Sequence, residues 1–182
     1  MPWHWGRIGE RQTAEDPAAV TAEALFARCE RPVGRFLVQM VGDRSLAEDL
    51  LQDTFHDAFR ARSQLLAAPS PEAWLFTMAR NRALSALRRR RRSIVALAHL
   101  PRPRERSERD VQEVVTLRDL LERHLDPDER ALLLLRYLHG FDANELAEMI
   151  GLTPEAVRQR LSRSRRKLIS ASAAEVQPGE ER

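Results

Sequence analysis

Apolar side chains recur along most of this chain at the three- and four-residue spacing of amphipathic helices. The pattern predicts a helix over residues 22–41, with Pro32 as a point where it could kink, and a second helix over about 45–62. After a short loop, Ser70 is placed to cap a long helix that begins at Pro71 and enters an arginine cluster. Strictly alternating β-branched runs are absent from the sequence, which therefore predicts an all-α fold.

The second half of the chain carries further helix signals. Asp110 is predicted to begin a helix that ends near Leu125, and the pair Asp126-Pro127 marks the start of the next helix. Residues 142–168 then have the form of a helix-turn-helix. Its first helix begins with a capping box, because Asp142 is followed three residues later by Glu145.

Three residues meet the steric needs of that motif. Ala147 lets the two helices approach, Gly151 can adopt the positive φ that ends the first helix, and Val157 packs the second helix onto the first. Thr153 is placed to cap the second helix, ahead of Pro154. The predicted buried stripe of this helix consists of Val157, Leu161, Ser164 and Leu168. The residues left free to meet DNA in the major groove are Arg158, Gln159, Ser162, Arg163 and Arg166.

The predicted elements divide the chain into two small helical domains. The segment between them is rich in proline and charge, which is typical of a linker rather than of a packed element. The expected divisions are an N-terminal tail at 1–20, a first domain at 21–92, the linker at 93–109, a second domain at 110–169 and a C-terminal tail at 170–182.

Charge is distributed unevenly, although the chain has 30 basic and 27 acidic residues. Residues 80–92 contain seven arginines and no acid, whereas residues 43–57 contain five acids and one arginine. Blocks of this kind predict a polarised surface. The arginine block is expected to attract phosphates, with an affinity that falls as salt rises.

The acidic block forms one face of the helix at 45–62. Asp49, Gln52, Asp53 and His56 share this face, which we interpret as a docking surface for a basic partner helix. A plain solvated face is the first alternative. The second is a metal-dependent nuclease, because Asp49, Asp53 and Asp57 follow one another at four-residue steps.

The long helix from Pro71 offers groups suited to nucleic acid. Asn81 can present a donor and an acceptor to a base edge, and Trp74 can stack on an unpaired base, unless it belongs to the core. The arginine run at 88–92 either contacts phosphates or forms a solvated helix end.

Other kinds of site find little support in the sequence. Cys29 is the single cysteine and lies in an apolar stripe, which excludes an intrachain disulfide and a thiolate zinc cluster. The histidines lack metal-ligand spacing, and neither a Gly-rich phosphate loop nor a nucleophile motif occurs. We expect no catalytic residue, no metal and no cofactor. Apolar runs such as Ala131–Leu135 are too short to cross a bilayer and no signal-peptide core is evident, so we expect no membrane insertion and a cytoplasmic location.

Three segments together resemble the bacterial RNA polymerase sigma factors of the sigma-70 family, extracytoplasmic-function (ECF) subgroup. DRSLAEDLLQDTFHDAFRAR (43–62) resembles the polymerase-binding segment, and AWLFTMARNRALSALRRRRR (73–92) resembles the segment that melts and reads the −10 promoter element. LDPDERALLLLRYLHGFDANELAEMIGLTPEAVRQRLSRSRRKL (125–168) resembles the domain that binds the −35 element. The resemblance implies a sigma2-like helical bundle and a sigma4-like helix-turn-helix joined by a flexible linker.

The resemblance also implies a role for each surface. The partners would be core RNA polymerase, through its β′ coiled coil and β flap, promoter DNA, and an anti-sigma factor that occludes both domains. Docking on the β′ coiled coil would use Asp49, Gln52, Asp53 and His56. The −10 element would lie near Trp74, Arg80, Asn81, Ser85 and Arg88, with Asn81 holding an everted base. The −35 element would meet Thr153, Arg158, Gln159, Arg160, Ser162, Arg163 and Arg166. The chain would then initiate transcription; a stand-alone helix-turn-helix regulator that dimerises through its first domain is the alternative.

Overall fold

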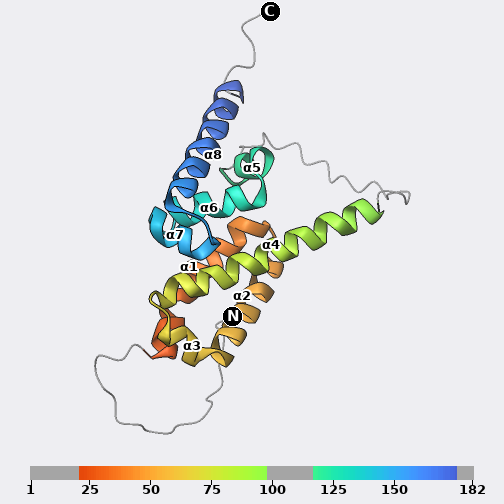
Figure 1. Cartoon of the computed structure of the whole chain (residues 1–182). Coiled ribbons are helices and arrows are strands. Elements are labelled where there is room, and N and C mark those ends of the chain that lie inside the picture. Colours follow the sequence, from red (N-terminus) through yellow and green to blue (C-terminus); the bar gives the residue numbers. More distant parts are fainter. Residues whose placement is uncertain (1–20, 98–116, 176–182) are drawn as a thin grey trace, which may run out of the picture.

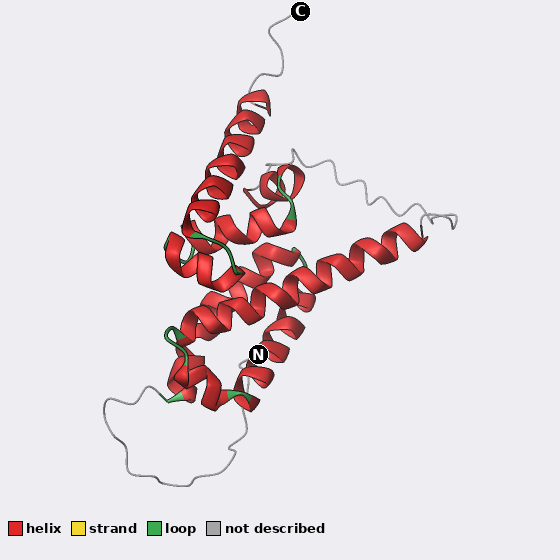
Figure 2. Ribbon diagram, viewed as in Figure 1, coloured by secondary structure: helices red, strands yellow, loops and turns green. Residues whose placement is uncertain are grey.

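The computed structural model describes residues 21–97 and 117–175, and this part of the chain consists of helices and short turns without a strand (Figures 1 and 2). It confirms the predicted all-α class. None of the described helices is long and apolar enough to span a bilayer. The helices are α1 (Ala22–Val41), α2 (Arg44–Arg60), α3 (Arg62–Ala67), α4 (Pro71–Leu97), α5 (Leu117–His124), α6 (Pro127–Tyr137), α7 (Ala143–Ile150) and α8 (Pro154–Glu175).

The first domain is built around α1, whose inward face is apolar. Thr21 caps this helix by accepting a hydrogen bond from the backbone N–H of Ala24 (3.2 Å), and Gly42 ends it with a φ of 71°. The buried stripe packs against α2 and α4 and includes Cys29, whose thiol pKa is raised by burial. Cys29 is therefore a core residue, as its place in the apolar stripe predicted. Pro32 lies inside α1, which continues through it.

Several element boundaries differ from the sequence prediction. α3 occupies part of the segment predicted as a loop, because Leu65 is fully buried and α3 packs on α4. Ser70 then accepts a hydrogen bond from the backbone N–H of Ala73 (3.3 Å) and begins α4 as predicted. α4 continues to Leu97, beyond residue 93 where the linker was expected, because the next proline is Pro101.

The C-terminal helix is also longer than predicted. α8 extends to Glu175, into the segment expected to be a tail, because neither glycine nor proline interrupts the chain before Pro178. The N-terminal tail, the expected helix start at Asp110 and the rest of the predicted linker lie outside the described residues.

The second domain contains the predicted helix-turn-helix. Reciprocal capping boxes start α6, at Asp126 and Glu129, and α7, at Asp142 and Glu145. Gly151 ends α7 with a φ of 69°, the left-handed conformation that its position predicted. α8 then packs on α5, α6 and α7 through a buried stripe of Val157, Leu161 and Ser164, with Leu168 partly buried.

The two domains lie against each other, which the sequence pattern did not predict. α6 contacts α1 and α4, and α7 contacts α4 (Figure 1). The contact is aromatic: the Phe76 ring lies 4.6 Å from the His139 ring and 5.2 Å from the Phe141 ring, measured between centroids. Phe36 of α1 completes this interdomain aromatic cluster, at 5.8 Å from both Phe76 and His139.

A second point of contact lies at the end of α1. The guanidinium of Arg118, at the start of α5, lies so close to Gly42 that a Cβ added there would overlap it. Because that guanidinium is the end of a flexible side chain and can move aside, the positive φ is what requires glycine at position 42.

The interdomain position of His139 determines its charge. Burial, with a further contribution from the positive charge of Arg35, lowers the pKa of His139 from its ordinary value of 6.5 to about 4. Its Nε2 atom is buried and has no hydrogen-bond partner among the described residues. The imidazole is thus packed in its neutral form.

We expect acid to weaken this packing. The pKa of His139 is about 4 in the packed protein and 6.5 in the unfolded chain. Packing of the neutral imidazole therefore contributes fully to the free energy of unfolding above pH 6.5, and this contribution is lost as pH falls toward 4. Thermal unfolding recorded across that range tests the expectation, with His139→Phe as the control because it keeps a ring and cannot titrate. As pH falls, the melting temperature of the wild type is expected to decrease more than that of the variant. Equal decreases would contradict the expectation.

Candidate nucleic-acid interfaces

The four residues of the predicted docking surface lie together on α2. Asp49, Gln52, Asp53 and His56 are all exposed, and their spacing places them on one side of the helix. Asp53 already has a partner within the protein, because its carboxylate accepts a hydrogen bond from Arg82 of α4 at 3.2 Å. The surface keeps its predicted position, with part of its negative charge already neutralised.

Arg82 connects α2 to α4, a role that sequence reasoning missed. Its guanidinium binds the carboxylates of both Asp53 and Asp57, and its side chain is 27% exposed. These are two of the three aspartates considered as metal ligands. A protein cation therefore occupies the place where the nuclease alternative needs a metal ion. No group of three metal-ligating side chains converges within the described residues.

An open groove of about 610 Å³ runs between α2 and α4. Asn81, Ser85 and Arg88 line it at steps of four and three residues, so they form one row along α4. All three side chains are exposed. Arg89 and Arg92 extend the groove toward the C-terminal end of the helix. Four arginines and two aspartates line this groove, so its net charge is positive and attracts the phosphates of nucleic acid.

Two other predicted −10 residues lie outside this groove. Trp74 is partly buried and packs on the core, which agrees with the alternative considered for it. Arg80 is only 14% exposed and forms an ion pair with Asp128 of the second domain, 48 residues away in the sequence. It also donates a hydrogen bond to the Asn81 side-chain oxygen at 3.2 Å. Burial lowers the pKa of the Arg80 guanidinium, and the neighbouring carboxylate of Asp128 opposes that effect.

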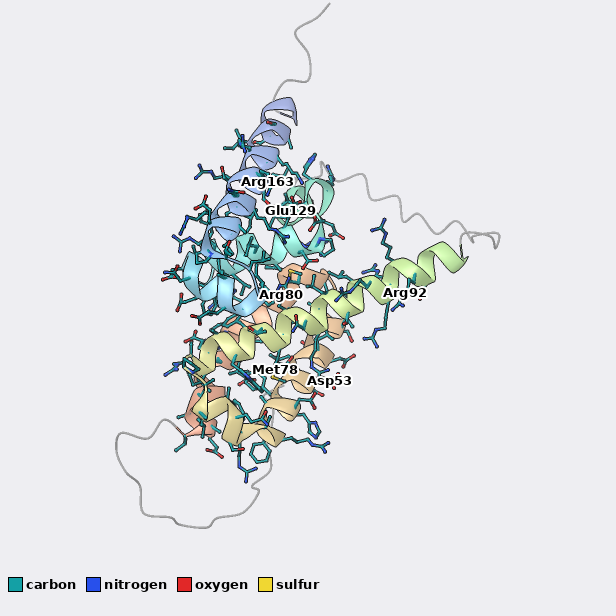
Figure 3. All side chains as sticks on the ribbon, in the orientation of Figure 1. Asp53, Met78, Arg80, Arg92, Glu129 and Arg163 are labelled. Carbon is teal, nitrogen blue, oxygen red and sulfur yellow. The ribbon has the colours of Figure 1, made fainter. Side chains whose placement is uncertain are left out.

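The second basic surface lies on α8. A shallow groove of about 450 Å³ is lined there by Glu155, Arg158, Gln159, Ser162, Arg163 and Arg166, which include five of the seven predicted −35 residues. Figure 3 shows Arg163 on α8, away from α4. The grouping follows from helix spacing, because these positions differ by three or four residues.

The remaining two residues predicted to contact the −35 element lie outside this groove. Thr153 caps α8 by accepting a hydrogen bond from the Ala156 N–H (3.2 Å). Arg160 is exposed but lies outside the groove, and its charge acts on Arg80 of the first domain.

Glu155 is a further member of this surface that sequence reasoning missed. Its carboxylate binds Arg158 at 3.0 Å and Gln159 at 3.4 Å. The signal in the sequence was a single acid among arginines in the first turn of the helix. Through these two contacts, Glu155 holds the side chains of Arg158 and Gln159 in defined positions.

Comparison with known proteins identifies the family. The model of sigma-70 region 2 matches residues 25–93, and that of sigma-70 region 4 matches residues 119–168. The RNA polymerase sigma factor CarQ of Myxococcus xanthus is 34% identical over 157 residues, which cover 84% of this chain and 90% of the relative. This chain belongs to the sigma-70 family. Its relatives include the ECF sigma factor SigL of Mycobacterium tuberculosis, 27% identical over 79% of this chain and 84% of the relative.

Solved structures of sigma factors share the fold. The sigma factor RpoE of Bartonella quintana, in complex with the anti-sigma factor NepR, superposes with a TM-score of 0.65, at 24% identity over 80% of this chain and 92% of that one. CnrH, in complex with the cytosolic domain of CnrY, superposes with a TM-score of 0.60. The two chains are 25% identical, and the match covers 84% of this chain and 88% of CnrH. This sigma factor of the ECF subgroup thus has the predicted sigma2-like and sigma4-like domains, and the alternative of a stand-alone regulator is set aside.

The bridge formed by Arg82 generates a stability prediction. We expect a double-mutant cycle of Arg82→Leu and Asp57→Asn, measured by urea unfolding, to give a favourable coupling of about 0.2–1 kcal/mol, since the pair is partly exposed. A cycle of Arg44→Leu and Glu48→Gln serves as the control, because that pair lies within one helix and Arg44 is 87% exposed. The control coupling should be smaller. Zero coupling for Arg82 with Asp57 would show that the bridge does not join α2 to α4 in solution.

Proposed function

We propose that this sigma factor docks on the polymerase β′ coiled coil through the α2 surface and reads two promoter elements with its two arginine-lined grooves, without catalysis of its own. The observation that carries the proposal is the division of these grooves. One lies on the domain matched to region 2 and the other on the domain matched to region 4. The acidic docking surface belongs to the same helix, α2, that forms one wall of the first groove.

The first groove is suited to the −10 element. Arg88, Arg89 and Arg92 would hold the sugar-phosphate backbone, which is a sequence-independent contact. Asn81 would present its amide to a base, and Ser85, one turn further along α4, offers a hydroxyl on the same row. A base in this position would have to leave the duplex stack, because under this proposal a single strand would lie between the two helices.

The α8 groove is suited to the −35 element as duplex DNA. A single helix with its polar side chains on one face fits the major groove, where arginine pairs with guanine and glutamine with adenine. Arg158, Gln159 and Arg163 are the proposed base readers, and Arg166 would contact the sugar-phosphate backbone of the DNA. Thr153 and the start of α8 would approach a phosphate.

Two further proposals concern partners. The solved structures of RpoE and CnrH are complexes, the first with the anti-sigma factor NepR, and we propose that an anti-sigma protein also controls this chain by covering both domains. The second domain would meet the polymerase β flap. Since bacterial polymerase and chromosome share the cytoplasm, this is the compartment in which the proposed function operates.

Reconstituted transcription tests the function directly. Start sites mapped after overexpression would supply a cognate promoter, and the purified chain with core polymerase should then give runoff transcripts from it. A folded chain that binds core enzyme but yields no specific start would exclude the proposal.

Polymerase docking is tested by Asp49→Arg. Asp49 is exposed and forms no ion pair with another described residue, so its replacement changes the docking surface without breaking the bridge to Arg82. We expect affinity for core polymerase to fall about tenfold or more, because a like charge would face a basic partner. Glu30→Arg on the exposed side of α1 makes the same change of charge elsewhere. Titration of each labelled variant with core enzyme measures its affinity. An equal loss of affinity in the two variants would mean that the docking surface is misplaced.

Readout of the −35 element is tested by Arg163→Ala. If Arg163 contacts a base, we expect a loss of about 1–3 kcal/mol on the cognate promoter and a smaller loss on a promoter altered at that base pair. Competition between promoter variants for the holoenzyme measures this difference. Arg165→Ala is the matched control, because Arg165 is exposed on the same helix but does not line the groove. A uniform loss on all sequences would instead indicate a phosphate contact.

A further inference from the structure

The basic surface of α8 contains one carboxylate. Glu155 is the only acid between residues 154 and 174, whereas residues 158–167 carry six cationic side chains. Glu155 lines the α8 groove, and its side chain is 64% exposed. A negative charge on a surface proposed to meet DNA lowers its attraction for phosphates. The presence of Glu155 there calls for an explanation other than attraction to DNA.

The two oxygens of this carboxylate have different partners. Oε2 accepts hydrogen bonds from Nε of Arg158 at 3.2 Å and from Nη2 at 3.0 Å, so that one edge of the guanidinium is held against α8. Oε1 accepts a hydrogen bond from the side-chain nitrogen of Gln159 at 3.4 Å. Two of the five N–H groups of the Arg158 guanidinium are thus used inside the protein. The other N–H groups remain for a ligand, and a base edge needs two of them.

Internal contacts separate the proposed base readers from the proposed phosphate contact. Arg163 is held within the helix as well, because its Nε donates a hydrogen bond to the backbone carbonyl of Gln159 at 3.4 Å. Arg166 is exposed and makes no hydrogen bond or ion pair with another described residue. An arginine that turns freely can meet the nearest phosphate, which carries no sequence information. An arginine held on one edge presents its other donors in a fixed direction.

We propose that Glu155 is a specificity-determining residue of the −35 surface, which acts by positioning Arg158 and Gln159. Its carboxylate keeps the Arg158 guanidinium off the nearest phosphates and directs the remaining donors to one place in the major groove. Its charge also weakens binding to every duplex, so that DNA without a matching base there is bound poorly. Glu155 thereby lowers affinity and raises discrimination. This inference rests on the proposed reading of the −35 element by α8.

A role in helix stability alone is the alternative. An acid in the first turn interacts favourably with the positive end of the helix dipole, whatever side chains lie near it. Two variants separate the roles. Glu155→Asp keeps the charge in the first turn, but it is one methylene shorter and loses its reach to Arg158 and Gln159. Glu155→Gln keeps the length and removes the charge.

Competition between promoters tests the proposal on the holoenzyme assembled from core polymerase and each variant. The two competitors are the cognate promoter and the same promoter altered at the −35 base pair where Arg158→Ala loses discrimination. We expect Glu155→Gln and Glu155→Asp each to reduce the ratio of the two affinities about threefold, which is within the range of an exposed ion pair. Glu148→Gln, which removes one exposed charge from α7, is the matched control and should keep the wild-type ratio. Circular dichroism verifies that each variant is folded.

Salt dependence on the altered promoter provides a second readout, which a purely structural role would not move. In Glu155→Asp the released Arg158 should contact a phosphate. The logarithm of the affinity should then fall more steeply with the logarithm of salt concentration, by about 0.9 in slope. Because Glu155→Asp retains the negative charge, net charge does not account for such a change.

The outcomes distinguish this role from the proposed function. A wild-type ratio in folded Glu155→Asp, or an equal effect of Glu155→Gln with and without Arg158→Ala, would overturn the role of Glu155 and leave −35 readout by α8 standing. A wild-type holoenzyme that distinguishes no −35 base pair would remove the proposed readout, and the role of Glu155 with it.

Discussion

The arrangement of this protein depends on the contact between Phe76 and the second domain. Phe76 is fully buried, yet two of the three rings around it, His139 and Phe141, come from the other domain. Each domain therefore leaves an apolar area that the other covers. Burying one large apolar side chain is worth about 1.5–3 kcal/mol. A contact of this size holds two tethered domains together and can be exceeded by the binding energy of a large partner.

The arginines of the first domain have two distinct uses. Arg82 binds Asp53 and Asp57 inside the bundle, so it joins α2, which we propose docks on polymerase, to α4, which we propose contacts the −10 element. Arg88, Arg89 and Arg92 line a groove and are exposed to solvent. Arg80 differs from both groups, because its partner Asp128 belongs to the second domain. The charge available to DNA thus depends on which internal carboxylates are in place.

Local features of the fold could be predicted because a few adjacent residues determine them. The capping box at Asp142, the turn at Gly151 and the buried stripe led by Val157 each follow from steric or hydrogen-bonding needs within one motif. The contacts of Arg80 and His139 could not be predicted in this way. They join segments far apart in the sequence, and no periodicity reports which surfaces of two amphipathic domains meet. Helix spacing did place Asn81, Ser85 and Arg88 on one row, whereas Arg80 is rotated about 100° from Asn81.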